Sequence, residues 1–350
     1  MSNIILNGNI CLRERIYLSF VSKKPFYIKN IRNNFKKPGL KSFEIDLFSL
    51  INKLSSNCSI KINETGTHLK FTPGYIQQGN LIHNTDGTRS LSYYLEFMTY
   101  LIPLIGGKLN IKIVGIRSLK ADASLETFAY VNLALLRKMW GCNLKLRVTT
   151  NIISKKKNTE VILFCPKIDL CKSFQINKRG LIIAFQVILT TSSDNLFNNE
   201  NLNAFLPKKL INCGFDFKIH NFRIFNREIK FRTITILAET STGCILSNDL
   251  TLTKKTIKVK EFVEFYRKIF LDFLKHFISG NCIDAYNQVF FLINLINVNS
   301  KGCSEIKIKK FTLSSIYFLR ESNFFLGFLF KIKFLKNSRK ILIQKNLSFF

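Results

Sequence analysis

The sequence predicts a layered α+β fold built from repeated helix-on-sheet units, with a smaller α+β domain inserted into it. Segments with helical periodicity alternate with short strand patterns over most of the 350 residues. Hydrophobic residues make up 47% of the chain, which is enough for an extensive core. The pattern of apolar and polar residues changes after Arg179-Gly180, and this change indicates the inserted unit.

The first unit is predicted from its periodicities. A strand is expected at PFYIKNI (25–31) and a helix at FEIDLFSLINKL (43–54). The apolar residues of that helix share one face: Phe43, Leu47, Leu50, Ile51 and Leu54. CSIKIN (58–63) and THLKF (67–71) alternate as strands around the turn Glu64-Thr65-Gly66. These elements make one helix beside a small sheet.

A second round of elements follows. We expect a helix at 90–105, a strand at 108–114, a helix at 123–140, and strands at 143–150 and 160–164. Asp122 or Ser124 is suited to cap the helix at 123–140, and Gly141 to end it.

The domain boundaries follow from a change in the residue pattern. IIAFQVIL is a buried-strand run, residues 190–203 are polar and loop-like, and a helix at 204–212 precedes the strands FDFKI and ITILAET. We therefore predict an inserted domain at 185–256, a large domain at 1–184 and 257–340, and a C-terminal tail at 341–350. In the large domain, an apolar stripe predicts a long helix from Val259 to Phe277 that stops at Gly280, and a last helix–strand pair runs from 312 to 334.

The net charge of the chain is +31, from 53 Lys and Arg against 22 Asp and Glu. Such a chain is attracted to polyanions such as RNA, DNA or an acidic membrane. The sequence is also rich in Lys, Asn, Ile and Phe, which A+T-rich coding favours, so drift in composition is an alternative source of the lysines. Drift does not explain the scarcity of acids.

One stretch concentrates this charge beside a Pro-Gly turn. KNIRNNFKKPGLKSFE (29–44) holds five cations before its acid Glu44. The candidate RNA-binding residues are Arg13, Arg15, Lys29, Arg32, Lys36, Lys37 and Lys41. Two alternatives stay open: the lysines lie on a solvated loop, and Arg13 forms a structural ion pair with Glu14 or Glu96.

The cysteine and histidine pattern gives no sign of a metal or cofactor site. The nine Cys are scattered singly without a C-x-x-C, and the four His do not pair with them, so we expect no metal ligand set. This usage fits a reducing compartment. We also expect no signal peptide and no membrane association, since no apolar run approaches the ~20 residues of a membrane span.

Five segments together resemble the RNA 3′-terminal phosphate cyclase superfamily. They are LRERIYLSFVSKKPFYIKNIRNNFKKPGLKSFE (12–44), NETGTHLKFTPG (63–74), RSLSYYLEFMTYLIP (89–103), AETSTGCILSNDL (238–250) and CIDAYNQ (282–288). The last two point to the cyclase-like branch. The resemblance covers about residues 5 to 335. It implies a large domain of three repeats, each like the C-terminal domain of a translation initiation factor, and one inserted domain.

The chain departs from the cyclases of this superfamily at the positions that their chemistry needs. Cyclases carry G-x-G-G-G-Q near the N-terminus, whereas LNGNICLRER keeps only Gly8. Cyclases follow P-G-L with Gln-His, where this chain has Ser42, Phe43 and Glu44. They also adenylylate a His in H-x-x-D-Q, and alignment on Gln288 places Asp284 there. We therefore expect no cyclase activity and no bound cofactor.

The cyclase-like branch implies a role in ribosome assembly. Its members are expected in the nucleolus of the nucleus, in the small-subunit processome, bound to pre-rRNA and to a large ribosome-assembly GTPase, where they support 18S pre-rRNA processing. Some relatives carry Arg-Asp-x-Lys, proposed to serve in pre-rRNA cleavage, where this chain has Arg320-Glu321-Ser322-Asn323. Arg320 and Glu321 are thus candidates for partner binding or, as the alternative, for catalysis in an endonuclease that cleaves near the 18S 3′ spacer.

Overall fold

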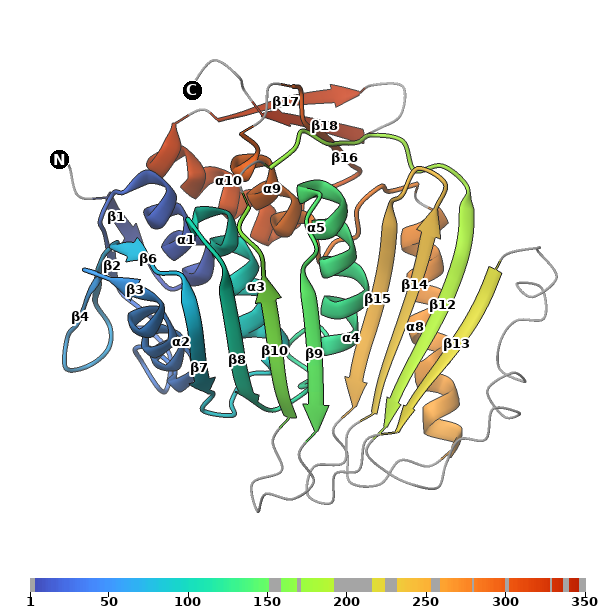
Figure 1. The fold of residues 1–350 in the computed structure, drawn as a ribbon, viewed down its shortest axis with the longest axis horizontal. Coiled ribbons are helices and arrows are strands. Elements are labelled where there is room, and N and C mark those ends of the chain that lie inside the picture. Colours follow the sequence, from blue (N-terminus) through green and yellow to red (C-terminus); the bar gives the residue numbers. More distant parts are fainter. Residues whose placement is uncertain are drawn as a thin grey trace.

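The computed structural model describes residues 4–150, 159–168, 171–191, 216–223, 232–252, 259–278, 280–299, 302–327, 329–335 and 340–345. Figure 1 shows an N-terminal sheet (blue), a second sheet (blue through teal to green) and a C-terminal sheet (mostly red) around a group of helices. A fourth sheet stands beside them with one long helix against it. The predicted α+β class is confirmed.

All four of the four-stranded sheets of the described chain have the same pairing pattern. The N-terminal sheet, in the order β1-β2-β5-β4, consists of β1 (Ile4–Asn7), β2 (Phe26–Lys29), β4 (Ser59–Ile62) and β5 (Leu69–Thr72). The second, in the order β7-β8-β10-β9, consists of β7 (Gly79–Asn84), β8 (Leu109–Gly115), β9 (Lys145–Thr150) and β10 (Thr159–Cys165). In each, the first two strands pair in parallel and the other pairs are antiparallel. The short strands β3 (Ser55–Ser56) and β6 (Tyr75–Ile76) pair with each other.

The C-terminal sheet follows this pattern and takes in part of the predicted tail. Its order is β11-β16-β18-β17, with β11 (Gln175–Ile176), β16 (Glu305–Ile308), β17 (Phe330–Leu335) and β18 (Lys340–Lys345). β18 lies between β16 and β17, and Ile343 on it is fully buried. Residues 341–345 are therefore part of the sheet, because their apolar side chains alternate into the core.

The helices between these sheets carry the main core. They are α1 (Leu12–Ser22), α2 (Ser42–Leu54), α3 (Leu91–Leu101), η1 (Ile102–Leu104), α9 (Gln288–Asn297) and α10 (Leu313–Leu326). α1 contacts α10 and α3, and α9 contacts α3 and α10, so helices from the two ends of the chain pack together. The hydroxyl of Tyr17 on α1 donates to Asn297 Oδ1 at the end of α9, 2.7 Å away.

The helix predicted at 123–140 has three parts. α4 (Leu125–Thr127) leads into a π-helical turn, η2 (Phe128–Asn132), and then α5 (Leu133–Trp140). Of the two caps considered, Ser124 is the one used, since its side chain accepts a hydrogen bond from the Thr127 N–H. Gly141 ends the helix with a left-handed backbone, as predicted.

The fourth sheet has its own hydrophobic core. It runs β13-β12-β14-β15, with β12 (Ile182–Thr191), β13 (Asp216–Arg223), β14 (Arg232–Thr240) and β15 (Ile245–Leu252). Helix α8 (Val259–Ile278) packs on it and buries Ile269, Phe270 and Phe273 against the sheet. The sequence analysis assigned this helix to the large domain, but its apolar stripe meets the face of this sheet. The helix predicted at 204–212 lies outside the described residues.

Candidate functional site

The charged loop between β2 and α2 is held in one shape by backbone contacts. The Gly39 N–H donates to the Ile31 carbonyl at 2.9 Å, and this bond closes the loop. The Leu40 N–H donates to the Gly66 carbonyl at 3.0 Å, which ties the loop to the β4–β5 turn. Gly39 has φ of 85°, and a Cβ there would lie 2.4 Å from the Thr65 carbonyl oxygen, so only glycine fits this close approach.

Arg32 belongs to the frame of this loop. Its guanidinium makes two hydrogen bonds of 2.7 Å to the Glu44 carboxylate, and its Nη1 also donates to the Gly39 carbonyl. The Lys41 N–H donates to the same carboxylate, so Glu44 also caps α2. The arginine side chain is only 8% exposed. The Arg32 charge is thus neutralised within the loop.

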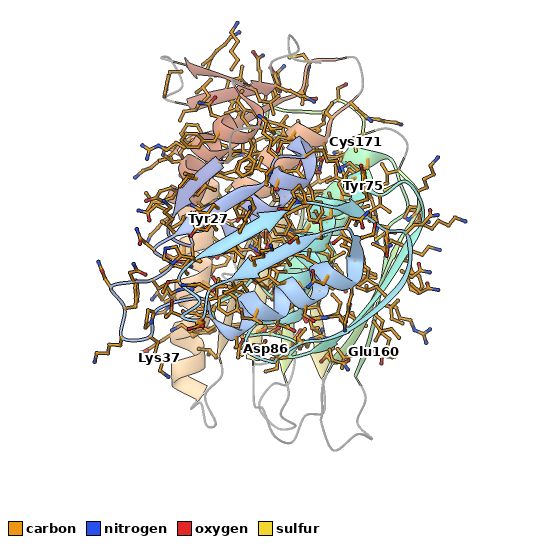
Figure 2. The ribbon with its side chains drawn as sticks, turned by 90° about the vertical axis from the view of Figure 1, so that its left-hand side faces the viewer. Tyr27, Lys37, Tyr75, Asp86, Glu160 and Cys171 are labelled. Carbon is orange, nitrogen blue, oxygen red and sulfur yellow. The ribbon has the colours of Figure 1, made fainter. Side chains whose placement is uncertain are left out.

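The four lysines of the loop lie on the surface. Lys29, Lys36, Lys37 and Lys41 are all exposed. Figure 2 shows Lys37 projecting from the edge of the N-terminal part of the molecule. Because Arg32 occupies Glu44, that acid does not neutralise the lysines, and the loop presents positive charge on a rigid support.

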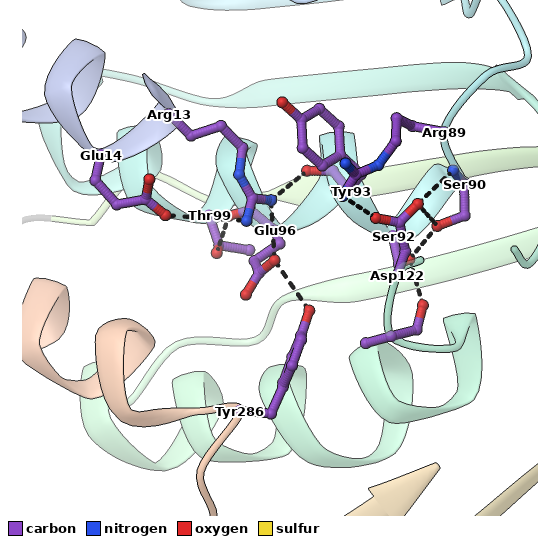
Figure 3. Close-up of polar contacts among 11 residues, drawn as sticks. Arg13, Glu14, Arg89, Ser90, Ser92, Tyr93, Glu96, Thr99, Asp122 and Tyr286 are labelled. Atoms are coloured by element: carbon purple, nitrogen blue, oxygen red, sulfur yellow. Dashed lines mark hydrogen bonds and ion pairs between the residues drawn. The ribbon is translucent and has the colours of Figure 1, made fainter. Parts of the chain in front are cut away.

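Arg13 lies in a buried polar network. Its Nη1 donates to Glu96 Oε2 and to the Tyr93 carbonyl, each at 3.0 Å, and a weaker pair with Glu14 spans 3.9 Å. The Tyr286 hydroxyl also donates to Glu96 Oε2, at 3.1 Å (Figure 3). The Glu96 charge holds the pKa of Arg13 well above its usual range, against the opposing effect of burial. Both ion pairs considered for Arg13 are present.

A second arginine completes this network on the other side of Tyr93. The guanidinium carbons of Arg13 and Arg89 lie 4.4 and 4.3 Å from the centre of the Tyr93 ring, which therefore stacks between two cations. Arg89 pairs with Asp122, which also accepts hydrogen bonds from Ser90 (Figure 3). Asp122 thus anchors the start of α3, which explains why it does not cap the helix at 125.

Arg15 and Glu321 form a buried ion pair between α1 and α10. Arg15 Nε donates to Glu321 Oε1 at 2.9 Å, and its side chain is 3% exposed. The same guanidinium donates to the carbonyls of Asn7 and Gly8. Burial raises the pKa of Glu321, an effect that the Arg15 charge opposes. The backbone between β1 and α1 is therefore bound to an internal arginine.

Arg320 and Glu321 face different surroundings although they are adjacent. Arg320 and Asn323 are exposed on α10, whereas Glu321 is buried against Arg15. The structure does not bring the Arg320 guanidinium and the Glu321 carboxylate together on one surface.

Asp284 is buried and saturated with hydrogen bonds. Its carboxylate accepts from the backbone N–H and side chain of Ser247, at 3.3 and 3.1 Å, and from those of Asn287, at 2.8 and 3.0 Å. Burial raises the pKa of Asp284, and the four donors oppose this rise. The residue fixes the turn before α9 against β15, so its geometry is that of a structural carboxylate.

Within the part of the chain that the structure describes, no three His, Cys, Asp or Glu side chains converge as a metal site would require. Among the same residues, no helix combines the length and apolar character of a membrane span.

The fold and these contacts define a mixed helix-and-sheet protein in which Arg13, Arg15, Arg32 and Arg89 pair with carboxylates, while the four lysines of the loop between β2 and α2 are exposed. The chain belongs to the RNA 3′-terminal phosphate cyclase family, whose sequence profile matches residues 4–332. The resemblance seen in the sequence is thus confirmed.

Three relatives illustrate the similarity. A probable RNA 3′-terminal phosphate cyclase-like protein of Dictyostelium discoideum is 27% identical over 96% of this chain and 94% of its own length. The human RNA 3′-terminal phosphate cyclase-like protein is 26% identical over 92% of this chain and 88% of its own. The rRNA processing protein rcl1 of Schizosaccharomyces pombe is 23% identical over 89% and 86%.

The sequence analysis missed Arg89, Asp122 and Tyr286 as parts of one network. They come from segments up to about 200 residues apart, and the only local signal was the motif R-x-x-x-Y-Y-L-E, which places Arg89 four residues before Tyr93.

We predict that Glu321→Ala lowers the free energy of unfolding by about 3–5 kcal/mol, because it leaves the buried Arg15 charge without a partner. The double variant Arg15→Met, Glu321→Leu removes both charges and should regain most of that loss. Urea unfolding measures both, with Arg320→Ala on the exposed side of α10 as a control that should change stability by under ~0.5 kcal/mol. A double variant as unstable as the single one would contradict the assigned role of the pair.

Proposed function

We propose that this chain supports 18S pre-rRNA processing in the small-subunit processome by binding pre-rRNA and a large ribosome-assembly GTPase, without cyclase activity. The proposed lack of cyclase activity rests on the identity and surroundings of Asp284. A carboxylate stands where the resemblance puts the nucleophilic His, and it is buried under four hydrogen bonds. Asp in that position would form an unstable mixed anhydride in place of a phosphoramidate.

The names of the relatives support the proposed process. The S. pombe relative is named as an rRNA processing protein, and the Dictyostelium and human relatives are named as cyclase-like. The proposed location is accordingly the nucleolus of the nucleus.

Pre-rRNA would bind at the loop between β2 and α2. Lys29, Lys36, Lys37 and Lys41 are exposed there on a backbone fixed by Arg32, so they can contact phosphates at little cost in ordering the loop. Arg13 and Arg15, which the sequence also suggested, are paired with Glu96 and Glu321, so we do not propose them as phosphate contacts.

The partner surface is proposed at α10, with Arg320 as its charged contact. The alternative, an endonuclease that uses Arg320 and Glu321, needs a carboxylate within reach of the RNA to act as base. Glu321 is 6% exposed and paired with Arg15, so a scaffold role is better supported.

Our first prediction here is that the protein forms no covalent adenylate. Incubated with labelled ATP and Mg²⁺ and then denatured on a gel, it should carry no label, because no imidazole stands at position 284. A cyclase that retains H-x-x-D-Q serves as the positive control. A labelled band that survives denaturation would refute the proposal that cyclase chemistry is lost.

If the loop lysines contact RNA phosphates, they should contribute to the salt dependence of RNA binding. Each phosphate contact adds about 0.7–0.9 to the slope of log K against log salt, so Lys36→Ala, Lys37→Ala and Lys41→Ala together should flatten the slope by about two to three units. The matched control removes the same charge from exposed lysines elsewhere, Lys309, Lys331 and Lys333. Equal slopes for the two triple variants would assign binding to charge in general.

Arg320→Ala should weaken binding of the GTPase by about 1 kcal/mol, or about fivefold, through loss of an exposed charge at the rim of the interface. Calorimetric titration measures this, with Lys53→Ala as an exposed control. RNA affinity should hardly change, and purified protein should not cleave a spacer RNA. Intact partner binding combined with a cleavage activity that Arg320→Ala abolishes would favour the endonuclease.

A further inference from the structure

The outer face of the N-terminal sheet is open and carries a regular pattern of side chains. The inward residues of β2 and β5 are buried in the core: Phe26, Ile28, Leu69 and Phe71. Their neighbours alternate to the other side of the sheet, which no described helix covers.

The register places four of these outer residues in one row. Ile5 pairs with Tyr27, Tyr27 with Lys70, and Lys70 with Lys61, so the row crosses β1, β2, β5 and β4. Ile5, Lys61 and Lys70 are exposed, and Tyr27 is partly exposed. An aromatic ring thus lies within the sheet face with two lysines on its β5–β4 side.

A second ring lies beside the first. The centroids of the Tyr27 and His68 rings are 5.9 Å apart, with their planes 30° from parallel. His68 Nδ1 lies 3.0 Å from Thr67 Oγ1 and 3.3 Å from Asn63 Nδ2, and these contacts orient the imidazole. Lys29 Nζ lies 5.7 Å from the centre of the Tyr27 ring. Two oriented rings with adjacent ammonium groups are suited to stack bases and contact phosphates.

The face carries positive charge without carboxylates. None of the residues in β1, β2, β4 and β5 is Asp or Glu. The strands of the other four-stranded sheets of the described chain contain such residues, for example Glu160, Glu239 and Glu305. Charge complementarity therefore favours a polyanion on this face over the other sheets.

The face is continuous with the loop between β2 and α2. Lys29 ends β2 and starts the loop, and the Ile31 N–H donates to the Thr67 carbonyl next to His68. Figure 2 shows Tyr27 and Lys37 on the same side of the molecule. A strand of RNA on the sheet would therefore meet the loop lysines without crossing the molecule.

We propose that single-stranded RNA binds across the outer face of the N-terminal sheet, with bases stacked on Tyr27 and His68 and phosphates contacting Lys29, Lys61 and Lys70. This deepens the proposed function, on which it rests, by naming the form of RNA and the site. Four strands at ~4.8 Å spacing span about 14 Å, which is room for two or three bases. A duplex keeps its bases stacked inside, so it cannot use the two rings.

The test is binding of the full chain to a fluorescein-labelled single-stranded RNA of about twelve nucleotides, measured by anisotropy at fixed salt. Tyr27→Ala and His68→Ala should each weaken binding roughly tenfold, because base stacking on a ring is lost. Tyr27→Phe keeps the ring and should bind as the parent does. Tyr75→Ala is the matched control, because Tyr75 is 66% exposed but lies on β6, outside this face, and its loss should leave binding unchanged.

A second pair of variants avoids the core. Lys61 and Lys70 are exposed, so Lys61→Glu and Lys70→Glu should fold normally, as thermal melting would check, and should weaken binding of the same RNA at least tenfold.

The outcomes separate this site from the proposed function. If the parent binds no RNA, both proposals fail. If the parent binds RNA and neither the ring variants nor the lysine variants weaken it, this site is wrong and the proposed function stands. Equal affinity for a duplex of the same length, or ring variants that lower GTPase binding and leave RNA binding intact, would also overturn the site.

Discussion

The buried pair of Arg15 and Glu321 is the contact on which the arrangement of the molecule depends. It joins the first helix of the chain to α10, and a charge at this depth is tolerated only because its partner and the Asn7 and Gly8 carbonyls satisfy it. Glu321 is directed inward, whereas the preceding residue on the helix, Arg320, is exposed. The guanidinium of Arg15 therefore holds the backbone at Asn7 and Gly8, and its pairing with Glu321 leaves Arg320 as the exposed charge of α10.

The pairing of an arginine with a carboxylate recurs elsewhere in the described chain. Arg13, Arg32, Arg89 and Arg117 also pair with carboxylates, those of Glu96, Glu44, Asp122 and Glu126. Guanidinium groups suit such sites because they are planar and make several directed hydrogen bonds. Acids used in this way do not neutralise surface lysines. Composition alone fixes the net charge of +31, but the internal pairing of these acids leaves the surface lysines without these carboxylates as partners.

The sequence was sufficient to predict an element where the pattern of its apolar residues is local. Helix 43–54 was readable because its apolar residues fall on one face, and α2 (Ser42–Leu54) matches it. Helix α9 was not predicted, because Gln288 to Ile296 are all buried and a helix that is apolar all round has no periodicity to read. Arg32 could not be told from its lysine neighbours by composition. Its bond to Glu44 depends on a turn that brings the two side chains together. For Arg13, the sequence left both RNA binding and a structural ion pair open.

The distance in sequence between Arg15 and Glu321 has a consequence for synthesis. The partners are 306 residues apart, so at 5–20 residues per second the ribosome needs roughly 15 to 60 s to deliver Glu321 after Arg15 has been made. During that interval α1 has a cation on its inward side and no anion to receive it. The packing of α1 against α10 can therefore be completed only after α10 has been synthesised. Nascent chains of this protein are therefore expected to need protection from premature aggregation until α10 has left the ribosome.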